Sequence, residues 1–213
     1  MASLPKSFKL SQEVQTAIKK SSPIVALEST VITHGLPKSH NLELAREMER
    51  IVRKEGAVPA TIAVVEGRIC VGLSDRELAS LATQETHKLS SRDLAAAVTA
   101  KISGGTTVAA TLRVAAQAAI KVFATGGIGG VHRDSDWDIS ADLAELAVQK
   151  VLLVCAGAKA ILDLPATLEQ FETRGIPVVG YQTEEFPAFY SIESGLRTST
   201  KIDSVKNVAA LAN

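Results

Sequence analysis

The amino-acid sequence predicts an α/β fold with a mixed, mostly parallel sheet that is covered by helices on both faces. Strand-like and helix-like runs alternate along the chain. The first five residues of 23–30, and 151–157 up to its final glycine, are continuously apolar, as in strands buried on both faces. A hairpin signal at Glu66-Gly67 adds an antiparallel pair. We see no internal repeat, low-complexity tract or linker, so a single domain over residues 1–213 is expected.

Cap and turn residues mark the elements of the first half. Asn41 precedes a segment with apolar residues at helical spacing, and Gly56 suits the position after that helix. Ser74 and Glu77 form a capping-box pattern. The predicted order is a strand at 23–30, the helix between Asn41 and Gly56, hairpin strands at 60–65 and 68–72, a helix capped by Ser74, and an Ala-rich helix opened by Ser90 and Asp93.

The second half continues the alternation. Either Asp138 or Ser140 is expected to cap a helix at 141–150. The other predicted elements are a buried helix at 106–120, strands at 121–125, 151–157 and 176–181, and a helix at 164–175. Since ligands gather at the carboxyl ends of strands in such sheets, the residues that follow each strand are the first candidates for a site.

Composition excludes several function classes. Lys+Arg and Asp+Glu are 23 each, and aromatic residues are only 4%, which gives no electrostatic or stacking case for nucleic acid or an anionic membrane. Cys70 and Cys155 lie in apolar runs and read as buried thiols, which fits a reducing compartment. The N-terminus lacks the apolar core of a secretory signal, and no apolar run reaches the roughly 18 residues of a membrane span. We therefore expect a cytoplasmic protein.

The segment 124–143 combines a glycine-rich loop, GGIGG, with an aspartate cluster. The glycines do not match the spacing of a Walker or dinucleotide loop, but they permit close approach of the backbone to a ligand; a tight turn is the alternative. Asp134, Asp136, Asp138 and three later residues imitate the spacing of an EF-hand. Ile139 replaces the glycine that such a loop requires, so the EF-hand is rejected. A simpler metal site, or helix capping with surface acids, remains open.

Two ionisable residues end apolar strands. Lys159 follows 151–157, and partial desolvation there would favour the neutral, nucleophilic amine; the alternative is a lysine that reaches solvent. Glu28 closes 23–30, and burial would suit it to general acid catalysis; the alternative is a structural ion pair. Lys88 and Arg92 flank the start of a helix and could hold a phosphate.

Eight segments, taken together, resemble the pseudouridine-5′-phosphate glycosidases, the family that includes indigoidine synthase A-like proteins. The resemblance covers about residues 8–203 and rests on VALESTVITHGLP, EGAVPATIAVVEG, SSRDLAAAV, TTVAAT, FATGGIGGVHR, DISADL, VCAGAKAILDLP and GIPVVGYQT, in that order.

The resemblance implies a three-layer α/β/α fold, a homotrimer, and a divalent cation such as Mn²⁺. It implies reversible hydrolysis of pseudouridine 5′-phosphate to uracil and ribose 5-phosphate through a covalent adduct of a lysine with the ring-opened ribose phosphate. By match to the family's motifs, the catalytic residues are Glu28 as proton donor and Lys159 as nucleophile, and the metal ligand is Asp138. The implied substrate contacts are Lys88, Val108, Thr125, His132, Ser140, Ala141 and Asp142.

The sequence departs from the family pattern in two places. Ser91-Arg92 stands where a pair of arginines is expected, and we expect the chain to lack a C-terminal segment with an Asn-Pro-Ile-Pro-like motif that contributes an asparagine to the pocket. Two rival functions follow: a Schiff-base sugar-phosphate aldolase or isomerase, and a catalytically impaired phosphosugar-binding fragment.

Overall fold

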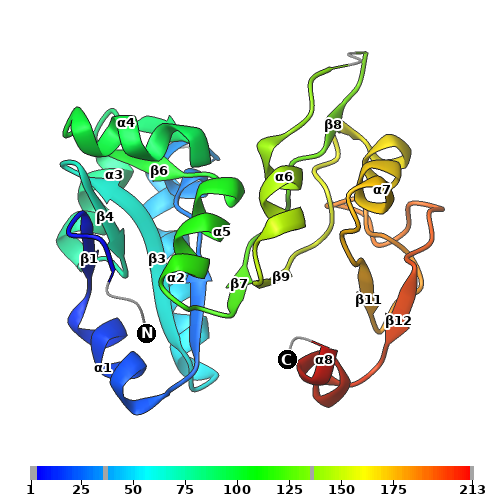
Figure 1. Cartoon of the computed structure of the whole chain (residues 1–213), viewed down its shortest axis with the longest axis horizontal. Helices are drawn as coiled ribbons and strands as arrows, with labels where there is room; N and C mark the ends of the chain where they lie inside the picture. The colour runs from blue at the N-terminus through cyan, green and yellow to red at the C-terminus, as the bar shows by residue number, and fades with distance from the viewer. Residues whose placement is uncertain (1–3, 36–37, 135–136, 212–213) are drawn as a thin grey trace. The chain divides into compact units, whose positions relative to one another are not determined.

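The computed structural model describes residues 4–35, 38–134 and 137–211 of the chain. The chain divides into two compact units, unit 1 (residues 1–124) and unit 2 (residues 125–213). Each unit is described by itself below, and the single domain expected from the sequence stays a prediction (Figure 1).

Unit 1 alternates short strands with helices. In chain order its elements are β1 (Phe8–Leu10), α1 (Gln12–Lys20), β2 (Ile24–Leu27), a π-helical turn (Val31–Gly35), α2 (Lys38–Lys54), β3 (Val58–Val65), β4 (Arg68–Val71), α3 (Asp75–Thr83), β5 (His87–Leu89), a 3-10 turn (Ser91–Asp93), α4 (Leu94–Thr99), β6 (Gly104–Thr106), α5 (Val108–Gln117) and β7 (Val122–Ala124).

The sheet of unit 1 is mixed and mostly parallel. Its strands run in the order β1-β4-β3-β2-β7, and β6 joins β3 to β5. The pairs β1–β4, β2–β3, β2–β7 and β5–β6 are parallel, whereas β3–β4 and β3–β6 are antiparallel. Helices α1, α2 and α5 contact the central strand β3 (Figure 1). The predicted mixture of parallel strands with a hairpin is therefore confirmed.

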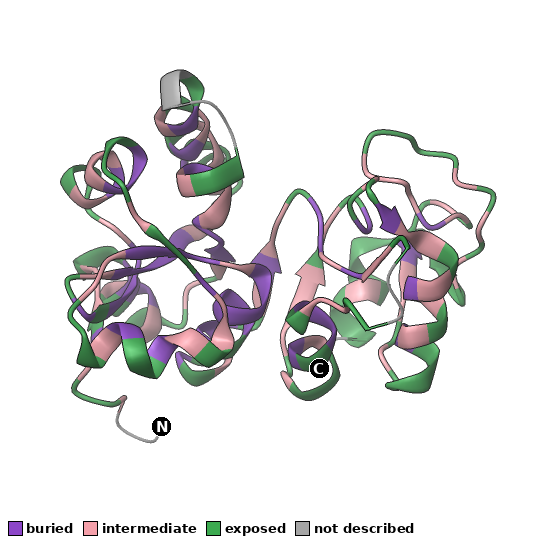
Figure 2. Ribbon diagram, turned by 90° about the horizontal axis from the view of Figure 1, so that it is seen from above, coloured by how far each residue is buried: buried purple, intermediate pink, exposed green. Residues whose placement is uncertain are grey.

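Burial of apolar side chains along β3 and α5 stabilises this unit. The six central residues of β3 are buried, and α5 buries seven of its ten residues. Phe123 of β7 and Leu112 of α5 are fully enclosed. Burying a side chain of this size contributes about 1.5–3 kcal/mol. Figure 2 shows buried residues concentrated along the central strands of this unit.

Most predicted boundaries of unit 1 are confirmed. The hairpin turns at Glu66 and Gly67, both with positive φ, and Ser74 and Glu77 form the predicted capping box of α3. Helix α2 begins at Lys38 rather than after Asn41. Asn41 is buried within it, because its side-chain amide donates to the carbonyls of Ile32 (2.7 Å) and Ala82 (2.9 Å).

Unit 2 has smaller elements. They are β8 (Val131–His132), α6 (Ala141–Val148), β9 (Leu152–Val154), β10 (Leu162–Asp163), α7 (Leu164–Thr173), β11 (Val179–Tyr181), β12 (Thr200–Ile202) and α8 (Val205–Leu211). β8 pairs antiparallel with β10, and β11 pairs parallel with β12, each pair as a two-stranded sheet. The predicted helices at 141–150 and 164–175 and strands at 151–157 and 176–181 are confirmed, with shorter bounds.

Across the described residues, no helix is long and apolar enough to cross a membrane. Cys70 is buried in β4, and desolvation raises the pKa of its thiol to about 11. Cys155 is half-buried, and desolvation raises its pKa as well. Raised pKa values keep both thiols protonated and weakly reactive, as expected for structural cysteines.

Candidate active site

Unit 1 gathers three predicted site residues where strands end. Glu28 follows β2, Lys88 lies in β5, and Val108 opens α5 directly after β6. β5 is held to β6 with Lys88 opposite Gly105. The amide of Thr107 then donates to the carbonyl of Leu89 (2.9 Å), which continues this pairing up to the first residue of α5.

These three residues differ in exposure, and exposure limits the chemistry that each can perform. Glu28 is only 9% exposed, as the general-acid interpretation requires. Lys88 is exposed and therefore available to an anionic ligand. Val108 is buried as a whole residue, so its predicted contact with a substrate stays a prediction. N–H groups in the first turn of a helix have no intrahelical partner and suit a phosphate.

The glycine loop of unit 2 makes close contacts within the protein, and the predicted approach of its backbone to a ligand stays a prediction. The amide of Gly129 donates to Oδ2 of Asp142 at 2.8 Å. A side chain at Gly129 would collide with Ser140 and Asp142, and one at Gly130 would collide with Thr167. Gly127 faces Phe189 in the same way. Of these glycines, Gly126 is exposed and in ordinary contact only, so it remains open to a ligand.

The buried Asp142 is thus positioned by a backbone donor. Its side chain is enclosed with the residue 6% exposed, near the start of α6. Ser140 caps this helix by accepting from the amide of Asp142 at 3.2 Å, which decides between the two predicted caps. The amide of Ser140 in turn donates to the carbonyl of Gly130 (2.9 Å). Ala141, the first residue of α6, is exposed.

Asp138 is paired with His132 instead of capping the helix. The two are joined by a backbone bond from the His132 amide to the Asp138 carbonyl (2.9 Å), and Nδ1 of His132 lies 3.2 Å from Oδ2 of Asp138. The Asp138 side chain is 64% exposed and the His132 side chain 40% exposed. Sequence reasoning placed both residues in the site but not in contact. The spacing of residues along the sequence gives no signal of this contact.

A divalent cation bound by Asp138 stays a prediction. In the described residues, no group of three or more His, Cys, Asp or Glu side chains could hold a metal ion. Asp138 nevertheless offers an exposed carboxylate, and hard cations that keep most of their waters bind through one or two carboxylates. Of the EF-hand-like positions, Asp134 is exposed as expected for a surface acid, and Asp136 lies outside the described residues.

Lys159 is exposed, which corrects the expectation of partial desolvation. Its backbone is fixed on both sides: its amide donates to the carbonyl of Ile128 (3.0 Å), and its carbonyl accepts from Leu162 (3.0 Å). Arg133 donates to the carbonyls of Leu162 (3.1 Å) and Ala160 (3.3 Å), next to the lysine. The lysine therefore projects from an ordered turn. Arg133 was missed from the sequence, where the only signal was its place in the matched segment FATGGIGGVHR.

Thr125 opens the glycine loop. Its residue is half-buried, and its amide donates to the carbonyl of Val154 in β9 at 3.0 Å. The bridge between Ile128 and Ala158 continues this contact toward Lys159. Unit 2 thus brings Thr125 and the glycine loop against the segment that carries the lysine.

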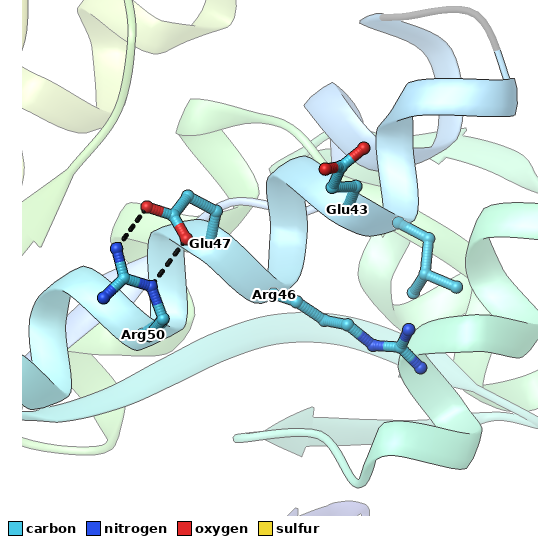
Figure 3. Close-up of a pocket in the computed structure, with 5 residues that line it drawn as sticks. Glu43, Arg46, Glu47 and Arg50 are labelled. Carbon is cyan, nitrogen blue, oxygen red and sulfur yellow. Dashed lines mark hydrogen bonds and ion pairs between the residues drawn. The ribbon is translucent and has the colours of Figure 1, made fainter.

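A pocket on α2 lies outside the predicted site. It is lined by Leu42, Glu43, Arg46, Glu47 and Arg50 (Figure 3). Arg50 forms a two-point ion pair with Glu47 (2.6 and 2.7 Å), and Arg46 forms one with Asp75 (2.8 and 2.9 Å). Because the arginines are paired within the protein, this pocket presents no ready anion site, and we do not assign the function to it.

Comparison with known proteins places these residues in a family. The family model described as "Indigoidine synthase A like protein" matches residues 13–213. The chain belongs to the indigoidine synthase A-like family. A protein of Herpetosiphon aurantiacus named pseudouridine-5′-phosphate glycosidase is 57% identical over 204 residues, which cover 94% of this chain and 67% of the relative. A protein of the same name from Staphylococcus aureus is 50% identical, over 98% of this chain and 69% of the relative.

Solved structures of family relatives confirm the predicted three-layer α/β/α fold. An indigoidine synthase A-like protein from Thermotoga maritima superposes with a TM-score of 0.91 at 34% identity, over 100% of this chain and 70% of that one. The prealnumycin C-glycosynthase AlnA, in complex with ribulose 5-phosphate, superposes with a TM-score of 0.90 at 41% identity, over 98% and 68%. The chain spans 60–69% of the length of eight curated relatives that are 50–58% identical to it.

Proposed function

We propose that this protein reversibly cleaves the C–C glycosidic bond of pseudouridine 5′-phosphate to give uracil and ribose 5-phosphate. The observation that carries the proposal is that a chain at least half identical to proteins named for this activity has an exposed lysine, Lys159, and a buried carboxylate, Glu28, at the positions predicted to react. The complex of AlnA supports the same chemistry. Ribulose 5-phosphate cannot close to a furanose because its O5 is phosphorylated, so it presents an open-chain sugar phosphate.

A carbon–carbon glycosidic bond requires an electron sink, because protonation of a leaving oxygen or nitrogen does not apply. In the proposed first step, Nζ of Lys159 bonds to C1′ as the C1′–O4′ bond breaks, and Glu28 gives a proton to O4′. In the second step, the ammonium formed on Nζ loses a proton and uracil C5 gains one, the electrons of the C1′–C5 bond return to the base, and the lone pair freed on the nitrogen forms C1′=N. Water then adds to C1′ and releases the lysine and ribose 5-phosphate. One water is consumed overall.

The other residues bind and position in this proposal. Lys88 and the start of α5 at Val108 hold the phosphate, and Asp142, fixed by Gly129, contacts the substrate. Thr125, His132, Ser140 and Ala141 line the sugar and base. Asp138 would hold a Mn²⁺ ion through its exposed carboxylate, and the cation would supply positive charge beside the phosphosugar. We also propose that the protein works as a homotrimer, which light scattering would test.

One assay separates this proposal from its rivals. The purified protein is incubated with pseudouridine 5′-phosphate and Mn²⁺, with and without chelator, and free uracil is measured. We expect uracil and ribose 5-phosphate in equal amounts, with loss of activity in chelator and recovery on excess Mn²⁺. Binding of ribose 5-phosphate with no uracil at any Mn²⁺ concentration would indicate a non-catalytic binding protein. Metal-independent carbonyl-transfer products would indicate an aldolase or isomerase.

A further inference from the structure

The carboxyl ends of β2 and β6 meet at one residue of β3. Parallel pairing of β2 with β3 ends with Leu27 opposite Thr61, and antiparallel pairing of β6 with β3 places Gly105 opposite Ala63. Because β4 occupies the other edge of β3 from Ile62 onward, β2 and β6 share one edge and approach Ile62 from opposite directions. A seam between the two strand ends lies there.

Two buried hydroxyls close this seam. Ser29 Oγ and Thr106 Oγ1 each donate to the carbonyl of Ile62 at 2.6 Å, and the amide of Thr106 donates to Ser29 Oγ at 2.9 Å. Since the Thr106 proton is used on Ile62, the 2.9 Å contact between Thr106 Oγ1 and Thr111 Oγ1 has Thr111 as donor. All three hydroxyl residues are 0% exposed. We call Ser29 and Thr106, with these bonds, the Ser29–Thr106 clamp.

The clamp connects the segments that carry the site residues of unit 1. Ser29 directly follows Glu28, and Thr106 is two residues before Val108. Thr106 also pairs with Leu89 of β5, next to Lys88. One hydroxyl pair therefore fixes the distance between the proposed proton donor and the proposed phosphate contacts.

The residues around the seam are closely packed and leave no room for an added side chain. A side chain at Gly105 would collide with the Thr33 hydroxyl and the Ser29 carbonyl. That carbonyl also accepts the amides of Ile32 (3.0 Å) and Thr33 (3.1 Å), so Ser29 is bonded through its backbone oxygen as well as its hydroxyl. In a buried region of low dielectric, breaking one of these bonds leaves a polar group unsatisfied, and the backbone has to shift to recover it.

We propose that the Ser29–Thr106 clamp is a positioning device for the reaction, which holds the Glu28 carboxyl at a fixed place relative to the phosphate contacts. This rests on the proposed function. The clamp residues do not touch the substrate in this proposal; they act through Glu28, Lys88 and Val108. A small displacement of a reacting group costs far more rate than binding, so the turnover number should respond more than KM.

The test compares valine substitutions at two buried threonines of neighbouring strands. Thr106→Val keeps the shape and removes the clamp hydroxyl, whereas Thr61→Val removes a buried hydroxyl that donates to Glu49 of α2 (2.6 Å). We expect Thr106→Val to lower kcat about 10- to 100-fold with a change in KM of less than about threefold, and Thr106→Ser to restore kcat. Thr61→Val should lower the urea midpoint and leave kcat unchanged.

Two further measurements keep the result decisive. If Thr106→Val does not fold, Thr111→Val removes only the donor to Thr106 Oγ1 and should give a smaller loss of kcat, still larger than that of Thr61→Val. If the wild-type protein releases no uracil, the proposed function has failed, and hydrogen–deuterium exchange then tests the clamp by itself, with a larger loss of protection in the peptides that carry Glu28 and Lys88 expected in Thr106→Val than in Thr61→Val. Equal losses in the Thr106→Val and Thr61→Val variants, in either assay, would overturn the inference.

Discussion

The two units hold their site residues by different means. In unit 1, strand register and buried hydroxyls fix Glu28, Lys88 and Val108, and apolar residues fill the core around them. In unit 2, turns and side-chain bonds to the backbone fix Asp142 and Lys159, and the paired strands are only two or three residues long. The lesson is that unit 1 is a rigid scaffold, whereas unit 2 presents its chemistry on loops.

Exposure of apolar side chains shows the same contrast. Among the described residues, Ile51 is the exposed large hydrophobic residue of unit 1. Those of unit 2 are Trp137, Val148, Val154, Ile161, Tyr181, Tyr190, Ile192, Val205 and Leu211. Substitutions of buried apolar residues in unit 1 should therefore cost more stability than substitutions of these exposed apolar residues in unit 2.

The largest effect should come from removing one reacting group from each unit. Lys159→Ala should abolish measurable uracil release with an unchanged urea midpoint, because the residue is exposed and only its side chain is lost. Glu28→Gln should lower kcat about 10²- to 10⁴-fold, the range for loss of a general acid. Near-normal turnover of Lys159→Ala would contradict the covalent mechanism.

The next-largest effect compares a buried apolar residue of unit 1 with an exposed apolar residue of unit 2. Leu112→Ala in α5 removes a fully buried side chain and should lower the free energy of unfolding by about 2–5 kcal/mol. Ile161→Ala in unit 2, at a residue 70% exposed, should change it by less than about 0.5 kcal/mol. Urea titrations of both variants measure this. A cost at Ile161 as large as that at Leu112 would show that the unit 2 surface is covered in solution.

A pH effect follows from the buried Cys70. Its folded-state pKa is raised from about 9 to about 11, so the folded protein binds more protons than the unfolded chain between these values, and stability falls as pH rises through this window. The loss should reach about 1–3 kcal/mol. Urea midpoints of wild type and Cys70→Ala from pH 8 to pH 11 test this: the variant pays a constant cavity cost, but its curve should be flatter. Parallel curves would refute the assignment.

The smallest effect distinguishes a helix N-cap with a purely structural role from an N-cap that also lies in the proposed active site. Ser74→Ala and Ser140→Ala each remove an N-cap hydroxyl and should cost about 1 kcal/mol of stability. Only Ser140→Ala should also raise KM for pseudouridine 5′-phosphate, since Ser140 lies against Gly129 and Asp142. Thermal unfolding and steady-state kinetics of both variants provide the comparison, and a raised KM in Ser74→Ala would argue against it.

The sequence predicted elements with strong local signals. The apolar run of β2, the hairpin at Glu66-Gly67 and the capping box of α3 have periodicity or turn chemistry of their own. It did not predict β5 and β6, because His87–Leu89 and Gly104–Thr106 are too short for periodicity and glycine is depleted in strands. β6 forms by pairing with β3, and β5 by pairing with β6. These pairings are tertiary contacts, which the local sequence pattern does not reveal.

The site was predictable in part for the same reason. Burial of Glu28 follows from its place at the end of an apolar strand, and the structure confirms it. Exposure of Lys159, the pairing of His132 with Asp138 and the bond from Gly129 to Asp142 depend on how loops close, and residue spacing carries no signal of that. The same limit explains why Ser140, and not Asp138, turned out to be the helix cap.

The central claim is that Lys159 forms the covalent adduct with the sugar. The direct measurement is borohydride reduction of the protein during turnover of pseudouridine 5′-phosphate, followed by peptide mass spectrometry. The account predicts a reduced ribose 5-phosphate adduct on the peptide that contains Lys159, and none in Lys159→Ala. Turnover without any trapped adduct, or an adduct on another lysine such as Lys88, would contradict it.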